Sequence, residues 1–176
     1  MKLSSVDAKR CIDLLSSIDM FTLEKKTRNK TILFEESEQE IRLRLRTHWQ
    51  NNPKIVETFI KNNSDLHEDD IQLIKNWKDQ KREHFFITKY GPEYTVFFSI
   101  KKDKTYAVLG LTECIYDVLP QKLPIFVEAC LLPYKNCIIW DGLVYIYTFS
   151  FGKYITNCLI NKCEKAEKEN KIITSF

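Results

Sequence analysis

The sequence predicts an α+β fold in which N-terminal helices and a C-terminal helix pack on a mainly antiparallel sheet of about five strands. Two observations support this prediction. All eight tyrosines and all four glycines lie beyond residue 83, together with seventeen of the twenty-two aromatic residues. Before that point apolar residues recur with helical spacing, whereas after it short runs of aromatic and β-branched residues alternate with turn signals.

The length and composition indicate a single domain, 1–176, with a helical part at 1–82 and a β-rich part with a C-terminal helix at 83–176. A chain of 176 residues is long enough to bury a sizeable core, and 44% hydrophobic with 29% charged residues is typical of an ordered globular protein. The net charge of +3 is not concentrated in a basic arm of the kind that binds nucleic acid, because lysines and arginines alternate with acidic residues.

Cellular location is predicted from what the sequence lacks. No apolar stretch has the length of a secretory signal or of a membrane-spanning helix, which needs about 20 residues. We therefore expect a cytoplasmic protein without a membrane partner. Disulfides are rare in a reducing compartment, so the six cysteines are expected to be free thiols, mostly buried as small apolar residues.

The first two helices are predicted from caps, spacing and charge. Ser4 or Ser5 can cap a helix whose apolar residues continue to Ile18. The run 41–46 alternates as a strand would, but acidic residues before it suit the start of a helix. The charge spacing also favours a helix, because it allows two i,i+4 pairs, Glu38 with Arg42 and Glu40 with Arg44.

Two further helices are predicted before residue 83. Asn52 can end one helix and cap the next, which begins at Pro53, because proline is tolerated in the first turn. A last helix is expected from about Glu68 to Arg82, because acidic residues lie at its start and basic residues toward its end.

The second part is predicted to be a meander followed by a hairpin. Short connectors between the strand-like runs favour antiparallel neighbours over crossovers. Asp141-Gly142 is expected to form a two-residue hairpin turn. The expected strands are 85–90, 94–100, 106–109, 125–132, 137–140 and 143–147.

A C-terminal helix is expected beyond Gly152, covering one face of the sheet. Ile172 and Ile173 are expected to form a short terminal strand or to tuck against the sheet. The residues expected on the covered side of the helix are Tyr154, Ile155, Cys158, Leu159 and Ala166.

No common catalytic motif occurs in the sequence. Four glycines cannot build the dinucleotide-binding fingerprint, and the P-loop pattern is missing. His48, His67 and His84 are far apart in the sequence, and the cysteine spacings C-x6-C and C-x4-C differ from the C-x2-C pairs of structural zinc sites. We therefore expect no metal and no cofactor.

Glu128 is the most conspicuous single residue, because it interrupts an apolar run in a predicted strand. Burial would raise its pKa unless a cation compensated. The favoured interpretation is a structural ion pair or hydrogen-bond acceptor. The alternative is a metal-dependent hydrolase or nuclease, in which Glu128 and Asp141 bind Mg²⁺ and Lys135 stabilises developing charge.

A base-stacking surface is another hypothesis, since bases stack on exposed aromatic rings beside cations. Aromatic residues in strands more often pack in the core. The cations would come from Lys89 and the turn 101–104. The aromatic residues in question are Tyr90, Tyr94, Tyr106, Trp140, Tyr145 and Tyr147.

The sequence favours a non-catalytic binding or regulatory module with a protein or nucleic-acid partner. The surface expected to bind the partner combines a short segment near the predicted hairpin with the basic turn. Its residues are Tyr134, Lys135, Asp141, Lys101, Lys102 and Lys104.

The segment from Phe126 to Leu143 resembles a family of uncharacterised bacterial proteins in which a glutamate, a Leu-Leu-Pro-aromatic step and an aromatic-Asp-Gly-Leu step recur. The resemblance extends to Trp77-Lys78 and to the strands at 94–111. It implies an intracellular bacterial or phage-related protein and indicates no reaction. The chain departs from the pattern at Asn136-Cys137, where the family has a glycine and a basic residue, so a ligand-contacting turn is not carried over.

Overall fold

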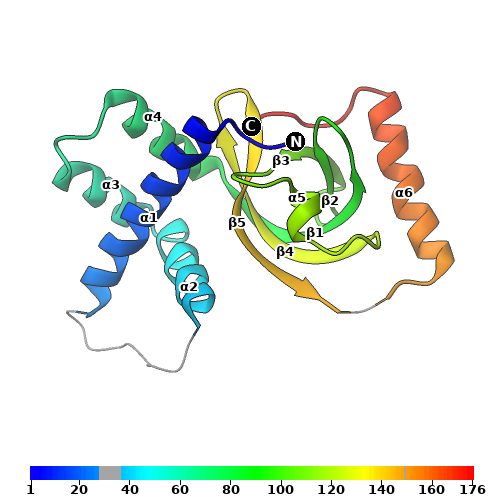
Figure 1. The fold of residues 1–176 in the computed structure, drawn as a ribbon, viewed down its shortest axis with the longest axis horizontal. Helices are drawn as coiled ribbons and strands as arrows, with labels where there is room; N and C mark the ends of the chain where they lie inside the picture. Colours follow the sequence, from blue (N-terminus) through cyan, green and yellow to red (C-terminus); the bar gives the residue numbers. More distant parts are fainter. Residues whose placement is uncertain (28–36, 149) are drawn as a thin grey trace. The chain divides into compact units, whose positions relative to one another are not determined.

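The computed structural model describes residues 1–27, 37–148 and 150–176 (Figure 1). These residues form two compact units. One is the helical unit, Val6–Lys78. The other is the barrel unit, which consists of Met1–Ser5 and Asp79–Phe176.

The helical unit contains the four predicted helices. Asn52 precedes α3, but its side chain donates to the His48 carbonyl oxygen instead of capping the helix. The last helix is shorter than predicted, because Arg82 already belongs to the first strand. The elements are α1 (Ser5–Thr27), α2 (Glu38–Gln50), α3 (Pro53–Asn62), α4 (Glu68–Asn76) and the 3-10 turn η1 (Trp77–Asp79).

The helical interpretation of the run 41–46 is confirmed by α2. Ser37 and Glu40 form a capping box at its start, in which each residue bonds the backbone N–H of the other. Glu38 pairs with Arg42 at 2.7 Å, as its i,i+4 spacing predicts. The carboxylate of Glu40 is bound to Ser37, and these bonds lower its pKa.

A buried ion pair joins α1 to α2. The Asp19 carboxylate accepts from the Arg46 guanidinium at 2.8 Å and from the indole N–H of Trp49 at 2.7 Å. The exposed fractions of the Asp19 and Arg46 side chains are 7% and 6%. A carboxylate this deeply buried depends on both donors, because removing Arg46 leaves a negative charge unbalanced in the core and removing the Trp49 N–H leaves a buried oxygen without its hydrogen bond.

The barrel unit is a closed five-stranded barrel with the strand order β1-β2-β3-β5-β4 (Figure 1). The OB-fold is another five-stranded barrel, and the helix α5 lies between the third and fourth strands here. The elements are β1 (Lys81–Tyr90), β2 (Thr95–Ser99), β3 (Lys104–Leu109), α5 (Ile115–Val118), β4 (Ile125–Tyr134), β5 (Cys137–Tyr147) and α6 (Lys153–Lys168).

The sheet is mostly antiparallel, as predicted, with one parallel pair between β3 and β5. Alternate residues of each strand point into the barrel. Phe85, Ile87 and Phe97 fill the interior and are fully buried. The α+β class is therefore confirmed, while the closure of the sheet is a feature that the sequence patterns did not predict.

The two chain ends complete the edge of β3. Only Val108 and Leu109 of β3 pair with β5. Earlier in β3, the N–H of Ile173 bonds the Thr105 carbonyl oxygen and the N–H of Ala107 bonds the Ile173 carbonyl oxygen, both at 2.9 Å. Beyond the strand, Gly110 exchanges backbone bonds with Met1 and Leu3. Ile173 therefore adds a terminal bridge to the barrel, one of its two predicted alternatives.

The expected hairpin at Asp141-Gly142 is wrong. Both residues lie inside β5, where two extra residues bulge between the pairs Ala129–Val144 and Leu131–Trp140. Gly142 has φ +82, a conformation that glycine adopts without steric cost. The turn between β4 and β5 is instead made by Lys135 and Asn136.

Helix α6 covers the outer face of β1, β2 and β3, so the predicted packing of a C-terminal helix on the sheet is confirmed (Figure 1). Leu159 and Cys163 pack against Phe86, Val96 and Phe98. The predicted inner side of the helix is partly wrong, because three of its residues face outward: Tyr154, 81% exposed, Ile155, 49% exposed, and Cys158, also exposed.

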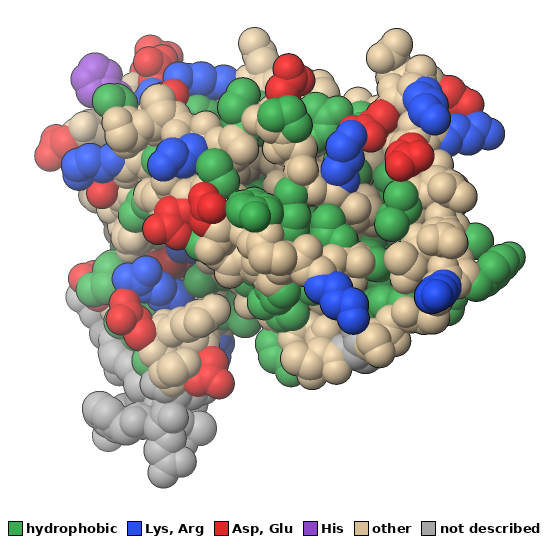
Figure 2. All heavy atoms as spheres, turned by 45° about the vertical axis from the view of Figure 1, so that its right-hand side comes forward, with side chains coloured by type: hydrophobic (Ala, Val, Ile, Leu, Met, Phe, Trp, Pro, Cys, Tyr) green, Lys and Arg blue, Asp and Glu red, His purple; other side chains and the backbone are tan. Residues whose placement is uncertain are grey.

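The prediction for the cysteines is confirmed in part. All six cysteines are free thiols, as predicted, but only three of them are buried. None of the helices within the described ranges is long and apolar enough to cross a membrane. On the face shown in Figure 2, hydrophobic side chains are exposed among charges of both signs, which do not gather into one large patch of a single sign.

The buried pair in the helical unit leads to the first prediction. Replacing Asp19→Ala should lower the free energy of unfolding by about 3–5 kcal/mol, because Arg46 would stay buried without its partner. Urea unfolding followed by tryptophan fluorescence measures the change. The matched control is Asp13→Ala, which removes an exposed i,i+4 pair with Lys9 and should cost about 0.3–0.5 kcal/mol. Equal losses in the two variants would contradict the prediction.

Candidate functional site

An open groove of about 620 Å³ lies on the outer face of the barrel unit, where β1, β4 and β5 run side by side. The turn between β2 and β3 forms one of its borders through Ile100 and Lys101. We call this hollow the aromatic groove. Its lining residues are Arg82, Glu83, His84, Ile100, Lys101, Phe126, Glu128 and Tyr147.

Four aromatic side chains form a continuous ladder in and beside this groove. His84 stacks on Phe126 with ring centroids 5.4 Å apart and planes 15° apart. Phe126 lies 5.2 Å from Tyr147, and Tyr147 lies 4.8 Å from Tyr145. Tyr145 is 57% exposed. We call these four residues the aromatic ladder.

The strand register explains why the ladder residues meet. His84 pairs with Glu128 across β1 and β4, while Glu128 and Phe126 pair with Tyr145 and Tyr147 across β4 and β5. Directly paired residues point to the same side of a sheet, and residues two apart share a face. These five side chains therefore all point outward, away from the barrel interior.

The polar ends of the ladder are ordered by hydrogen bonding. The Nε2 atom of His84 lies 3.0 Å from the phenol oxygen of Tyr147, and the direction of this bond depends on the tautomer of His84. Partial burial of the phenol, together with Glu128 and Tyr145, raises the pKa of Tyr147. The phenol therefore stays protonated at neutral pH and keeps its capacity to donate.

Arg82 lies between the two carboxylates that the sequence singled out. Its guanidinium bonds Asp141 at 3.1 Å and lies 4.0 Å from Glu128. The other Asp141 oxygen accepts from the backbone N–H of Leu143 at 3.0 Å, and the Asp141 side chain is fully buried. Glu128 is 37% exposed, on the outer face of β4. A cation shared by the two carboxylates would have to replace Arg82.

The arrangement of ligand-type side chains gives no support to a metal centre. Within residues 1–27, 37–148 and 150–176, no three His, Cys, Asp or Glu side chains are grouped closely enough to hold a metal ion. Lys135 lies at the β4–β5 turn, where its ammonium group is 5.2 Å from the Tyr134 ring. The geometry therefore favours the structural interpretation of Asp141 and Glu128 over the hydrolase.

Lysines gather at and near the β2–β3 turn, and one of them, Lys101, lines the groove. Lys102 pairs with Glu83 at 3.0 Å, and the side chains of Lys101 and Lys104 are exposed. Partial burial of its ammonium group, with the positive charges of Lys102 and Lys104, lowers the pKa of Lys81, although Asp79 and Glu83 oppose the shift. We call Lys81, Lys101, Lys102 and Lys104 the lysine cluster.

The structure separates the residues of the predicted binding surface. Tyr134 is 1% exposed and Asp141 is 2% exposed, so neither is available to a macromolecular partner. Of the aromatic residues considered for base stacking, Tyr106 and Trp140 are also buried. Tyr145 is exposed, and Tyr147 lines the groove together with Lys101.

Sequence reasoning missed the contributions of His84, Phe126 and Arg82. Each lies in a run that predicts a strand, but no local motif marks it as a surface residue. The register that places His84 beside Tyr147 joins positions far apart in the chain. The only local signal is alternation along β4, which puts Phe126 and Glu128 on one face.

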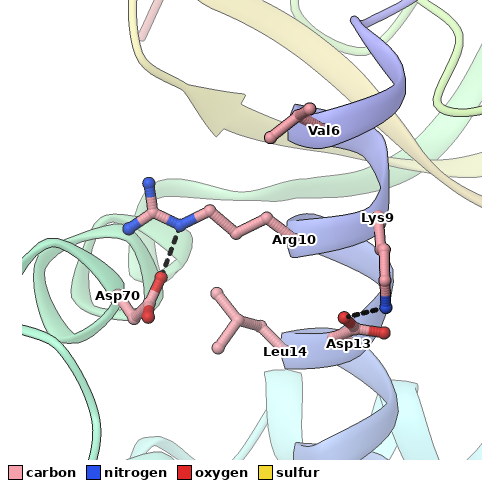
Figure 3. Close-up of a pocket in the computed structure, with 6 residues that line it drawn as sticks. All are labelled: Val6, Lys9, Arg10, Asp13, Leu14 and Asp70. Atoms are coloured by element: carbon pink, nitrogen blue, oxygen red, sulfur yellow. Dashed lines mark hydrogen bonds and ion pairs between the residues drawn. The ribbon is translucent and has the colours of Figure 1, made fainter.

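A second hollow, of about 370 Å³, lies in the helical unit between α1 and α4 (Figure 3). Lys9 pairs with Asp13 at 3.0 Å, and Arg10 points toward Asp70, with which it pairs at 2.5 Å (Figure 3). Each of its charged side chains therefore has an opposite charge within the hollow. We assign it no ligand.

Comparison with models of protein families, with curated proteins and with solved structures gave no match for this chain.

The pairing of Arg82 with Asp141 leads to the second prediction. Arg82→Met should lower the free energy of unfolding by about 3–5 kcal/mol, because it leaves the buried Asp141 carboxylate without its cation. Urea unfolding measures the loss.

The control for this prediction is the double variant Arg82→Met, Asp141→Asn. The amide oxygen can still accept from Leu143, and no charge is left buried, so at least half of the lost stability should return. A double variant no more stable than Arg82→Met would show that Arg82 acts through another contact.

Proposed function

We propose that the chain is a non-catalytic binding module that takes single-stranded nucleic acid in the aromatic groove. The observation that carries the proposal is the aromatic ladder beside the lysine cluster. Proteins that bind single strands combine aromatic rings, on which bases stack, with cations that follow the phosphate backbone. Lys101 of this cluster lines the same groove as His84, Phe126 and Tyr147.

The ladder supports stacking because three of its rings, His84, Phe126 and Tyr147, line the groove and the fourth, Tyr145, is 57% exposed beside them. Contacts between neighbouring rings hold the series in order. A base has an aromatic face whatever its identity, so this arrangement favours binding with little sequence preference. His84 and the protonated Tyr147 add hydrogen-bonding groups at the base edges.

The lysine cluster supports phosphate as the partner of these cations. Lys101 and Lys104 are exposed and Lys101 lines the groove, so these cations are placed to attract a phosphate backbone beside the ladder. A neutral peptide would gain nothing from these charges. The fold agrees, since OB-fold barrels often bind oligonucleotides, but this agreement is an analogy and does not carry the proposal.

Other expectations from the sequence remain proposals. These are a cytoplasmic location, membership of the bacterial family that the 126–143 segment resembles, and packing of the N-terminal helices on the sheet. The nuclease alternative is not favoured, because Arg82 occupies the space between Glu128 and Asp141.

The ladder leads to the third prediction. Tyr147→Leu should weaken binding of a fluorescent oligothymidine of about 12 nucleotides by about fivefold to a hundredfold, since one base-stacking contact is worth about 1–3 kcal/mol. Fluorescence anisotropy at low salt measures the affinity. Tyr154→Leu is the matched control, because Tyr154 is exposed on α6 away from the groove lining. It should bind like the unaltered protein.

Two other outcomes would contradict the proposed function. One is equal weakening in the two tyrosine variants. The other is a complete lack of binding by the unaltered protein, in which case a protein partner becomes the better hypothesis for the groove.

The lysine cluster leads to the fourth prediction. The double variant Lys101→Gln, Lys104→Gln should flatten the dependence of log affinity on log salt by about 1.4, since each lost phosphate contact on a single strand removes about 0.7. Anisotropy titrations over a range of salt concentrations give the slope. Lys153→Gln, Lys168→Gln, at the two ends of α6, is the control with equal charge loss. Equal flattening in both would show that only net charge matters.

A further inference from the structure

The wall of the aromatic groove continues beneath α6. Phe126 lines the groove and also packs against the cluster that α6 covers. Phe86 lies 4.8 Å from Phe126 between ring centroids, and Phe98 belongs to the same covered cluster. The aromatic series that begins at Tyr147 therefore runs without interruption onto the outer face of β1 and β2.

α6 buries little of its own surface on this face. Of its sixteen residues only Cys163 is buried, with Leu159 partly buried beside it. Its polar contacts with the barrel are those of Glu167 with Lys89 and Tyr94, and of Lys162 with Asp103 and the Phe98 ring. The lysine of each ion pair is about half exposed, so solvent weakens both pairs. No side chain caps the helix at Gly152.

We propose that α6 is a displaceable cover, and that the single-stranded nucleic acid bound in the groove extends onto the face beneath it, with Phe86 and Phe98 as further stacking positions. This inference rests on the proposed function. The face has the composition that stacking requires, because it combines these two rings with Tyr94 and Lys89. Helix and nucleic acid compete for it, so α6 limits affinity.

The competition defines how α6 variants should behave. Leu159→Glu places a charge in the contact between helix and barrel and should release α6. Its added negative charge opposes nucleic acid, so any gain in affinity comes from exposing the face. Cys158→Glu adds the same charge at the exposed neighbouring position and is the matched control.

The expected results follow from the number of stacking positions. Leu159→Glu should bind oligothymidine of about 12 nucleotides at least about fivefold more tightly than Cys158→Glu, the smallest gain that one more stacked base brings. Anisotropy measures both. Circular dichroism and gel filtration establish that the variants keep the barrel fold and remain monodisperse.

A second variant tests the reverse change without depending on a released helix. The Cys163 thiol lies beside Thr105, to which it hydrogen-bonds, so Thr105→Cys is placed to form a disulfide that fixes α6 on β3. Mass spectrometry verifies the bond. The oxidised variant should bind at least about fivefold more weakly than the same protein after reduction. The unaltered protein, treated identically, should show no change.

The outcomes separate this inference from the proposed function. Equal affinities of the oxidised and reduced variant, with Leu159→Glu no tighter than Cys158→Glu, would overturn the cover while leaving the groove intact if Tyr147→Leu still loses affinity. Absence of oligonucleotide binding by every protein in the set, including Leu159→Glu, would overturn both.

Discussion

Closure of a five-stranded sheet is the constraint on which the barrel unit depends. β1 is paired along both edges, with β2 and β4, whereas β3 and β5 meet through two residue pairs only. An unpaired strand edge invites association with other chains. Ile173 covers part of the remaining edge of β3 with backbone hydrogen bonds, and Met1 and Leu3 bond Gly110 directly after the strand. Most of this edge is therefore paired within the barrel unit.

The two outer faces differ because different elements border them. The face of β1, β2 and β3 is apolar and carries α6, while the face of β1, β4 and β5 exposes the aromatic ladder. Arg82 fixes the second face, since it links β1 to β5 through Asp141 across the intervening β4. The bulge at Gly142 lies directly after Asp141 in β5. Asp141, which the sequence offered as a metal ligand, thus helps to position the strands that carry the ladder.

Much of the secondary structure could be predicted from local chemistry. The run 41–46 alternates like a strand, yet its capping residue and the Glu38–Arg42 spacing outweigh that pattern. The hairpin predicted at Asp141-Gly142 is wrong because a glycine with positive φ occurs in β-bulges as well as in hairpin turns. Barrel closure could not be predicted, since the parallel β3–β5 pair joins segments about thirty residues apart, and no local pattern reports such a pairing.

The site was less predictable than the fold for the same physical reason. Lys101 was identified because a run of lysines in a short turn has to be exposed, whereas His84 and Phe126 reach the groove through a register that single-sequence patterns do not fix. The even mixture of charges along the chain also argued against a nucleic-acid partner. What matters for a phosphate is the local arrangement of cations, and the β2–β3 turn exposes Lys101 and Lys102, with Lys104 directly after them. A chain with a net charge of only +3 therefore still places one exposed lysine, Lys101, in the lining of the groove.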